Sequence, residues 1–442
     1  MISFFTISIR ALRFGTAGMR TMGMMVLFLW AGLDADAQSM RFITIDQAWR
    51  LAEKNYPLTA RRQLLAKARD FSVSNAAKGW YPQLSISGQA TLQSDVTNFP
   101  VKLPVPGFSF PAYSKDQYRV YAEADQALYD GGVIRDQRLG ALVSEQIDQK
   151  GLEVDLYALR DRIDQLYFGI LLLQQQVRQN ALLQADILNG IEKTQALIDN
   201  GTAMRSALDE LNAQLIQTDQ QRIQEETTGD AYLKMLGLLT GLALDRSTVL
   251  GTPPAAILED RIARPELQWY ELQKKNFDVQ DALADAALRP RLSLFLQGGY
   301  ARPGLNMLSN NFEWYYLGGV RLSWSLAGLY THRNERRLSE LGRRNLDVAA
   351  ETFVLNTRLS LEEDTALIRV YSELLRSDAR IIVLRTAVKH AAFAQLAEGV
   401  ISAHDYLVQV DAEDQARQAY ILHQVQCWQA EYNFQDHTGN HP

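Results

Sequence analysis

The segment YPQLSISG at residues 81–88 indicates the fold, because a similar segment, RPRLSLFL, occurs at residues 289–296. In each copy a proline follows a segment rich in Ala, Leu, Lys, Arg, Glu and Gln, and residues of alternating polarity follow the proline. Proline stops a helix, and a period of two is typical of a strand. We therefore predict that Pro82 and Pro290 mark two passages from helix to strand.

The chain of 442 residues contains further matches at a constant spacing. Both copies run from one proline to the next over the same interval, Pro57 to Pro82 and Pro265 to Pro290. Constant offsets are expected of a duplicated unit with one shortened loop. The repeat spacing predicts a first repeat at 38–250, a linker at 251–264 and a second repeat at 265–436. Outside the repeats, the sequence predicts a signal peptide at 1–37 and a disordered tail at 437–442.

Each repeat contains a predicted β-hairpin, at 82–129 and at 290–327. The strands are about ten residues long and have one apolar and one polar face, which is typical of strands in a transmembrane β-barrel. The first hairpin loop, FPVKLPVPGFSFP, carries four prolines and lacks polar turn residues. The alternative is an ordinary soluble hairpin packed on helices.

Long helices are predicted after each hairpin, over 133–199 and 331–397, because no proline occurs from 112 to 252 or from 304 to 441. A helix of that length would reach roughly 100 Å. In the first repeat, apolar residues from Leu152 to Val177 follow a heptad seam, which Thr357 and Asp364 interrupt in the second. Glycine-containing turns near 200 and 399 would reverse the chain into a second helix.

The N-terminus and the composition indicate an exported protein. Basic residues, the apolar run 24–33 and Ala35-Asp36-Ala37 have the pattern of a cleaved secretory signal. The alternative is a short membrane anchor, but ten apolar residues are too few to span a bilayer. A formal net charge of −6 argues against a nucleic-acid partner. The single cysteine, Cys427, excludes an intramolecular disulfide and is expected to pack on a helix.

Four strands cannot close a barrel, and an open edge in lipid leaves backbone groups unpaired. The chain is therefore expected to oligomerise. Three copies would supply twelve strands, and six copies would supply twenty-four.

The order of these features resembles that of the TolC family of outer-membrane efflux proteins, across about 42–436. The matching motifs are LYDGG at 128–132 and the turns NGTAMRSALDELNAQL and EGVISAHDYLVQVDA. The resemblance implies a mainly α fold in which three chains form a 12-stranded outer-membrane β-barrel and a periplasmic α-barrel. It also implies a passive exit duct of a tripartite efflux or type I secretion system. The implied partners are outer-membrane lipid, a periplasmic adaptor and an inner-membrane transporter of RND, ABC or MFS type.

The resemblance also assigns site residues at the two periplasmic tips. The turns expected to contact the adaptor are Asn200, Gly201, Thr202, Glu398, Gly399 and Val400. The pore constriction is expected at Asp405, Asp209 and Glu210. The chain departs from the family at three gate positions, Ala207, Ile401 and Val408, so its closed tip is predicted to be held differently. The alternative for Asp405 is a solvated residue in the first turn of a helix, stabilised by the helix dipole.

No pattern predicts an enzyme, a cofactor or a metal site. His437 and His441 are four residues apart but lie in the predicted disordered tail, where a metal site is not expected. Asp130-Gly131-Gly132 lacks the glycine fingerprint of a phosphate loop and is predicted to be a turn at the membrane boundary. The second functional hypothesis is a periplasmic coiled-coil scaffold that binds partners and conducts nothing.

Overall fold

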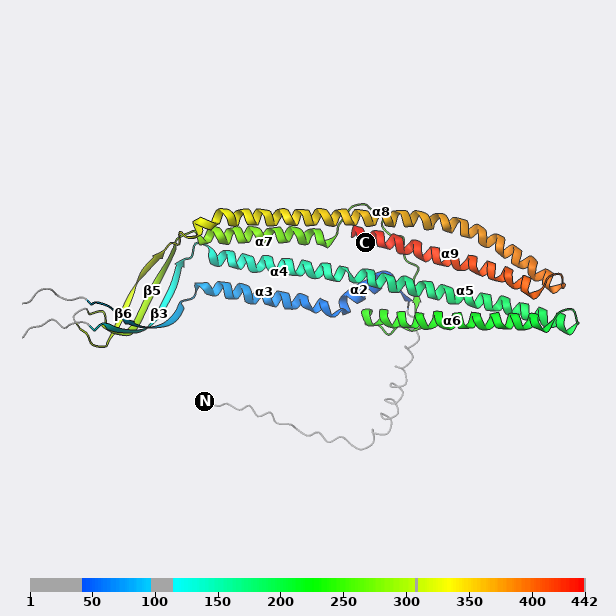
Figure 1. Cartoon of the computed structure of the whole chain (residues 1–442), viewed down its shortest axis with the longest axis horizontal. Helices are drawn as coiled ribbons and strands as arrows, with labels where there is room; N and C mark the ends of the chain where they lie inside the picture. Colours follow the sequence, from blue (N-terminus) through cyan, green and yellow to red (C-terminus); the bar gives the residue numbers. More distant parts are fainter. Residues whose placement is uncertain (1–41, 97–113, 307–308, 441–442) are drawn as a thin grey trace, which may run out of the picture.

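The computed structural model describes residues 42–96, 114–306 and 309–440. It shows an elongated chain with strands at one end and two helical hairpins at the other (Figure 1). The predicted signal peptide and the proline-rich loop lie outside the described residues. The main helices are α2 (Ile45–Asn55), α3 (Arg61–Ala77), α4 (Val133–Tyr157), α5 (Leu159–Asp199), α6 (Arg205–Thr240), α7 (Pro265–Ala287), α8 (Gly328–Ala397) and α9 (Ala403–Thr438).

Four strands form one antiparallel sheet in the order β2-β3-β5-β6. Their bounds are Gln83–Leu92 for β2, Asp116–Tyr129 for β3, Arg291–Arg302 for β5 and Glu313–Ser323 for β6. The two hairpins pair through β3 and β5, where Ala124 lies opposite Leu296 and Glu123 opposite Gln297. This register places most apolar residues on one face and most polar residues on the other across the four strands.

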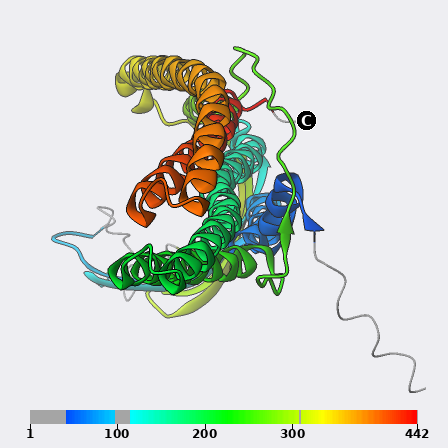
Figure 2. The ribbon, with the colours of Figure 1, turned by 90° about the vertical axis from the view of Figure 1, so that its right-hand side faces the viewer.

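The helices that adjoin the sheet follow the same order as the strands, because α3 packs on α4, α4 on α7, and α7 on α8. Seen along the long axis, the helices form a curved wall rather than a compact bundle (Figure 2). A short parallel pair of strands, β1 (Phe42–Ile43) and β4 (Val249–Leu250), lies beside the wall at mid-length with α2. There the largest apolar core forms around Trp49, Phe168 and Tyr432.

The long helices lie close to the predicted residue ranges, with one correction. The single helix predicted over 133–199 is interrupted at Ala158, which separates α4 from α5. At ψ −16° its backbone is closer to 3₁₀ than to α geometry, and its N–H donates to both Leu156 O and Val154 O. By contrast, α8 is continuous over 70 residues. Leu152, Leu156, Leu159, Ile163, Leu166 and Ile170 of the predicted seam are buried.

The prediction of a disordered tail from residue 437 is wrong for the described residues 437–440. Helix α9 continues to Thr438, whose carbonyl oxygen accepts a hydrogen bond of 2.6 Å from Ala263 N. Asn440 Nδ2 donates to two carbonyl oxygens of the linker. His437 Nδ1 lies 2.6 Å from Oδ2 of Asp364, the residue that interrupts the second seam. The linker and α8 therefore hold this end of the chain, while His441 lies outside the described residues.

Candidate functional site

The sheet exposes its apolar face. Leu84, Ile86 and Tyr316 are each more than four-fifths exposed, at 81%, 83% and 82%. Neighbouring strands continue the same face with Val120, Leu296 and others. A large contiguous apolar patch needs a partner or a membrane. The exposure argues against the alternative of a soluble hairpin packed on helices.

The opposite face of the sheet carries a charged network. Arg321 Nη1 on β6 lies 2.8 Å from Glu123 Oε1 and 3.1 Å from Asp125 Oδ2, both on β3. The Arg321 guanidinium also lies over the Phe295 ring of β5, 4.5 Å from the ring centroid. Gln297 Nε2 donates to the second oxygen of Glu123. The network ties three strands together on the polar face.

Both edges of the sheet and both edges of the helical wall are open within the described residues. Strands β2 and β6 each pair on one side only. Helix α3 exposes Leu64 and Phe71, and α8 exposes the apolar residues Leu338, Leu341, Val348, Leu355 and Leu359. Unpaired strand edges and an apolar helix face both require a neighbour.

Each passage from helix to strand contains one of the two repeated prolines. Pro82 lies between the 3₁₀ helix η2 (Lys78–Trp80) and β2, and Pro290 lies between α7 and β5. The return from β3 to α4 is the turn at 130–132. Asp130 accepts hydrogen bonds from Gly132 N at 2.9 Å and from Ile134 N at 2.6 Å. Gly131 has φ 78° and lies so close to α7 that a Cβ would meet a carbonyl oxygen at 2.8 Å.

The two predicted tip turns close the helical hairpins α5–α6 and α8–α9. Gly201 and Gly399 have φ values of 74° and 67°, a left-handed conformation that favours glycine after a helix. Asn200 and Glu398 are the respective C-caps. In the first turn, Thr202 Oγ1 donates to Leu197 O at 2.9 Å. Val400 in the second turn is 71% exposed, so its side chain is available to a partner.

The structure places the three predicted constriction acids near the tips and brings two of them beside one histidine. Asp405 Oδ2 accepts bonds from Ser402 N at 3.1 Å and Ser402 Oγ at 2.7 Å, in a capping box at the start of α9. These bonds lower the pKa of Asp405. The neighbouring His404 Nδ1 lies 2.7 Å from Glu210 Oε1 on α6. Asp209 is exposed on the same helix.

An apolar cluster lies behind these acids, between the two helical hairpins. Its buried members include Ile187, Leu211, Leu396 and Tyr406. Ala207 and Ile401, at two of the family's gate positions, pack against this cluster. Val408, at the third, is half-exposed.

Sequence reasoning missed a buried ionic cluster that joins the two hairpins. Lys389 Nζ on α8 lies 2.7 Å from Asp186 Oδ2 on α5 and 2.5 Å from Glu413 Oε2 on α9. Glu413 is only 3% exposed and also accepts bonds from Thr386 and Arg417. In the sequence, the only indication of this cluster is that three charged residues occur in otherwise periodic helices. Charged residues on a solvated helix face would give the same pattern.

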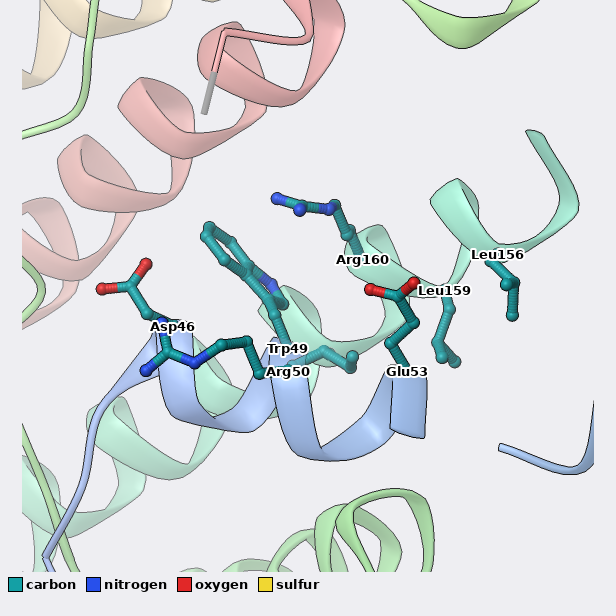
Figure 3. Close-up of a pocket in the computed structure, with 8 residues that line it drawn as sticks. Asp46, Trp49, Arg50, Glu53, Leu156, Leu159 and Arg160 are labelled. Carbon is teal, nitrogen blue, oxygen red and sulfur yellow. The ribbon is translucent and has the colours of Figure 1, made fainter. Parts of the chain in front are cut away.

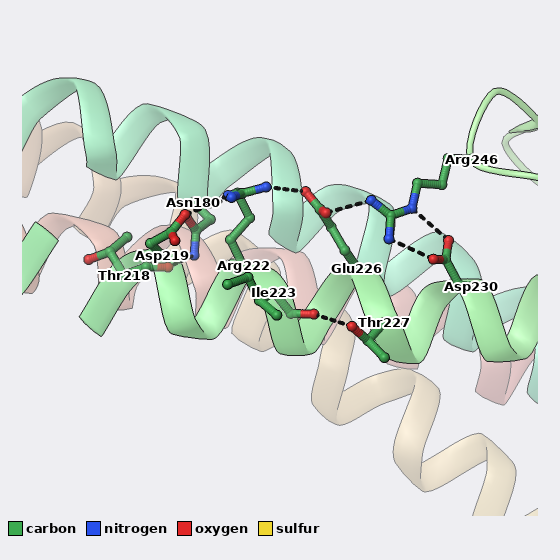
Figure 4. A network of polar contacts seen from close by, with 9 residues as sticks. All are labelled: Asn180, Thr218, Asp219, Arg222, Ile223, Glu226, Thr227, Asp230 and Arg246. Carbon is green, nitrogen blue, oxygen red and sulfur yellow. Dashed lines mark hydrogen bonds and ion pairs between the residues drawn. The ribbon is translucent and has the colours of Figure 1, made fainter. Parts of the chain in front are cut away.

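Two other polar regions lie at mid-length. A cavity of about 140 Å³ between α2 and α5 is lined by Trp49 and Arg160, whose guanidinium lies 4.7 Å from the Trp49 ring centroid (Figure 3). It is smaller than the usual few hundred Å³ of a substrate pocket. In the second region, Arg246 bonds Glu226 and Asp230 and holds the loop after α6 against that helix (Figure 4).

None of the helices in the described parts of the chain is both long and apolar enough to cross a membrane. Among those same residues, no group of three or more His, Cys, Asp or Glu side chains is placed to hold a metal ion.

No protein-family profile and no curated protein matches the chain. Solved structures do match it. CusC, whose structures concern conformational changes that accompany folding and transmembrane channel formation, is 14% identical to this chain. The TM-score is 0.67, and the match covers 93% of this chain and 96% of CusC. The outer-membrane protein VceC of Vibrio cholerae is 13% identical with a TM-score of 0.63, over 90% and 96%. The open MtrE outer-membrane channel of Neisseria gonorrhoeae is 14% identical with a TM-score of 0.62, over 90% and 89%. At the level of the fold, the chain therefore has the architecture of these outer-membrane channels, as the resemblance to the TolC family predicted.

Proposed function

We propose that this protein is an outer-membrane channel, a passive exit duct of a tripartite efflux or type I secretion system that reaches into the periplasm. The exposed apolar face of the open-edged sheet carries the proposal. In water such a face would be a costly patch, whereas in a bilayer it faces lipid tails. The polar face, with Arg321 and Glu123, would then line a lumen.

The open edges support a closed ring of identical chains. Three copies of the four-stranded sheet would give a 12-stranded barrel, with β2 of one chain beside β6 of the next. The same rotation would bring α3 beside α8 and extend the curved wall into a tube. A homotrimer thus satisfies the strand edges and the exposed apolar helix faces together.

The hairpin tips are the proposed contact with a periplasmic adaptor, and through it with an inner-membrane transporter of RND, ABC or MFS type. The tips lie at the opposite end of the chain from the sheet (Figure 1). Their turns expose Val400 and Met204, the latter at 79%. The energy for transport would come from the inner-membrane partner.

Contacts between neighbouring helices allow the trimer to be tested by cross-linking. At one level of the wall, each neighbouring pair of helices is joined by a contact: Arg61 with Asp155, Gly151 with Trp269, and Tyr270 with Phe353. Leu64 on α3 and Leu355 on α8 lie close to this level. Both side chains are exposed. A ring would therefore bring Leu64 of one chain near Leu355 of the next.

The variant with Leu64→Cys and Leu355→Cys should form oxidised trimers on non-reducing gels. The matched control pairs Leu64→Cys with Val383→Cys, which is exposed on the same helix about 40 Å farther along. The purified protein should also run as a heat-resistant trimer and give single-channel conductance in a planar bilayer. A protein that fractionates as soluble and conducts nothing would instead support the periplasmic scaffold.

A further inference from the structure

The segment after β6 carries exposed aromatic side chains and then a cluster of arginines. Trp324, directly after β6, is 61% exposed, and Tyr330, in the first turn of α8, is 87% exposed. The first turns of α8 then place several basic side chains around one shallow hollow. The lining residues are Asp281, His332, Arg333, Arg336, Arg337, Glu340 and Arg343. We call His332, Arg333, Arg336, Arg337 and Arg343 the basic cluster.

The members of the basic cluster differ in their partners. Arg336 and Arg343 reach acids of α7, with Arg343 Nη2 at 2.6 Å from Asp281 Oδ2. By contrast, Arg333 and Arg337 form no ion pair within residues 42–96, 114–306 and 309–440. They are exposed and four residues apart, so they lie on the same face of α8. Like charges at this spacing repel, and a bound anion would relieve the repulsion.

A second copy of the chain does not supply that anion in the proposed ring. Gly79 lies against Ile134, which places the end of α3 level with the start of α4 and therefore with the start of α8. The end of α3 and the turn that follows it, SVSNAAKGWY, contain a lysine and no acid. The nearest acid along α3, Asp70, is already bound by Arg69 at 2.8 Å. The neighbouring chain would bring positive charge to this level rather than a carboxylate.

We propose that Arg333 and Arg337 bind the phosphate groups of anionic phospholipids in the leaflet that borders the bases of the strands. This inference rests on the proposed outer-membrane location. An exposed aromatic belt followed by basic side chains is the order found where a protein leaves the hydrocarbon and enters the headgroup layer. The aliphatic stems of both arginines can lie along the apolar surface while the guanidinium groups reach the phosphates.

The test compares phospholipids that carry bromine on their acyl chains and quench nearby tryptophan. The full-length protein is placed in phosphatidylcholine vesicles that contain either brominated phosphatidylglycerol or brominated phosphatidylcholine. Wild type should prefer the anionic lipid, with a contribution of at most about five-fold per arginine at low ionic strength. The double variant Arg333→Gln/Arg337→Gln should lose this preference, and Arg333→Lys/Arg337→Lys should keep most of it.

The matched control is Arg380→Gln/Arg385→Gln, two exposed arginines of α8 roughly 70 Å from the basic cluster. It has the same change of charge and should behave as wild type. Equal quenching of wild type by both lipids, or an unchanged preference in the glutamine variant, would overturn the inference and leave the channel proposal standing. Quenching by neither lipid would show that the protein does not insert, and both proposals would fail.

Discussion

Replacing Lys389 with methionine should loosen the helical hairpins at the end of the chain opposite the sheet. The substitution removes the ammonium group that Asp186 and Glu413 share and keeps most of the side-chain volume. Removing one partner of a buried pair costs about 3–5 kcal/mol. The lower end applies because Glu413 keeps its bonds from Thr386 and Arg417. A cost of about 3 kcal/mol corresponds to roughly a 150-fold change in a local opening equilibrium.

Hydrogen exchange measures this local opening directly. Backbone amides of α5 and α9 near the tips should exchange up to about 150-fold faster in Lys389→Met than in wild type, while amides near the sheet should not change. The control is Arg376→Met, because Arg376 and its partner Glu373 are 74% and 66% exposed and such pairs contribute little. Unchanged exchange at the tips in Lys389→Met would refute the assignment of Lys389 as a tie between the hairpins.

The pH dependence of this effect follows from Glu413. Burial alone would raise its pKa, but hydrogen bonds from Lys389, Thr386 and Arg417 outweigh burial and lower the pKa to about 2. A lowered pKa means that the ionised residue stabilises the fold at every pH above its ordinary value of 4.5, and that this contribution is lost as the pH falls toward 2. Glu413 should therefore contribute equally to the stability of the wild-type tip at pH 5.5 and pH 8, and wild-type hydrogen exchange should show no step from Glu413 in this range after correction for intrinsic exchange rates.

Three further predictions concern single positions. The hydrogen bond and charge of Glu210 raise the pKa of His404, so this contact contributes fully below the ordinary histidine pKa and is lost as the pH rises through the raised value. Tip exchange should accordingly increase between pH 6 and pH 8.5 in wild type and stay flat in His404→Gln. Asp405→Ala should raise resting conductance or weaken block by divalent cations if its carboxylate lines the gate. Ser402→Ala, which also loses about 1 kcal/mol of capping but keeps that carboxylate, should not. Gly131→Ala, at φ 78° and against a carbonyl oxygen of α7, should lower the yield of heat-resistant trimer.

The periodic parts of the fold were predictable because their signals are local. Alternation after Pro82 and Pro290 indicates strands, and the long intervals without proline indicate helices, whatever the rest of the chain does. The interruption at Ala158 was not predictable, since alanine is the strongest helix former and the sequence around it continues the seam. The ordered structure of residues 437–440 was not predictable either. It depends on the contact of His437 with the carboxylate of Asp364 and on the hydrogen bond from the linker residue Ala263, and only the folded chain brings these residues close.

At the tip, the structure explains what replaces polar residues at two positions where the sequence differs from the TolC family. A family gate held by polar contacts would need polar side chains at the positions of Ala207 and Ile401. In this chain both residues pack instead into the apolar cluster between the two hairpins of one chain. That cluster and Lys389 join the hairpins within a chain. The exposed acids Asp405 and Glu210 contact Ser402 and His404 of the same chain, and in the proposed ring they would also face other copies. We therefore expect opening of the tip to require separation of contacts within each chain as well as between chains, and Lys389→Met to raise resting conductance along with hydrogen exchange. If exchange became faster and conductance did not change, Lys389 would stabilise the hairpins without controlling the opening of the tip. Contacts between chains would then hold the tip closed.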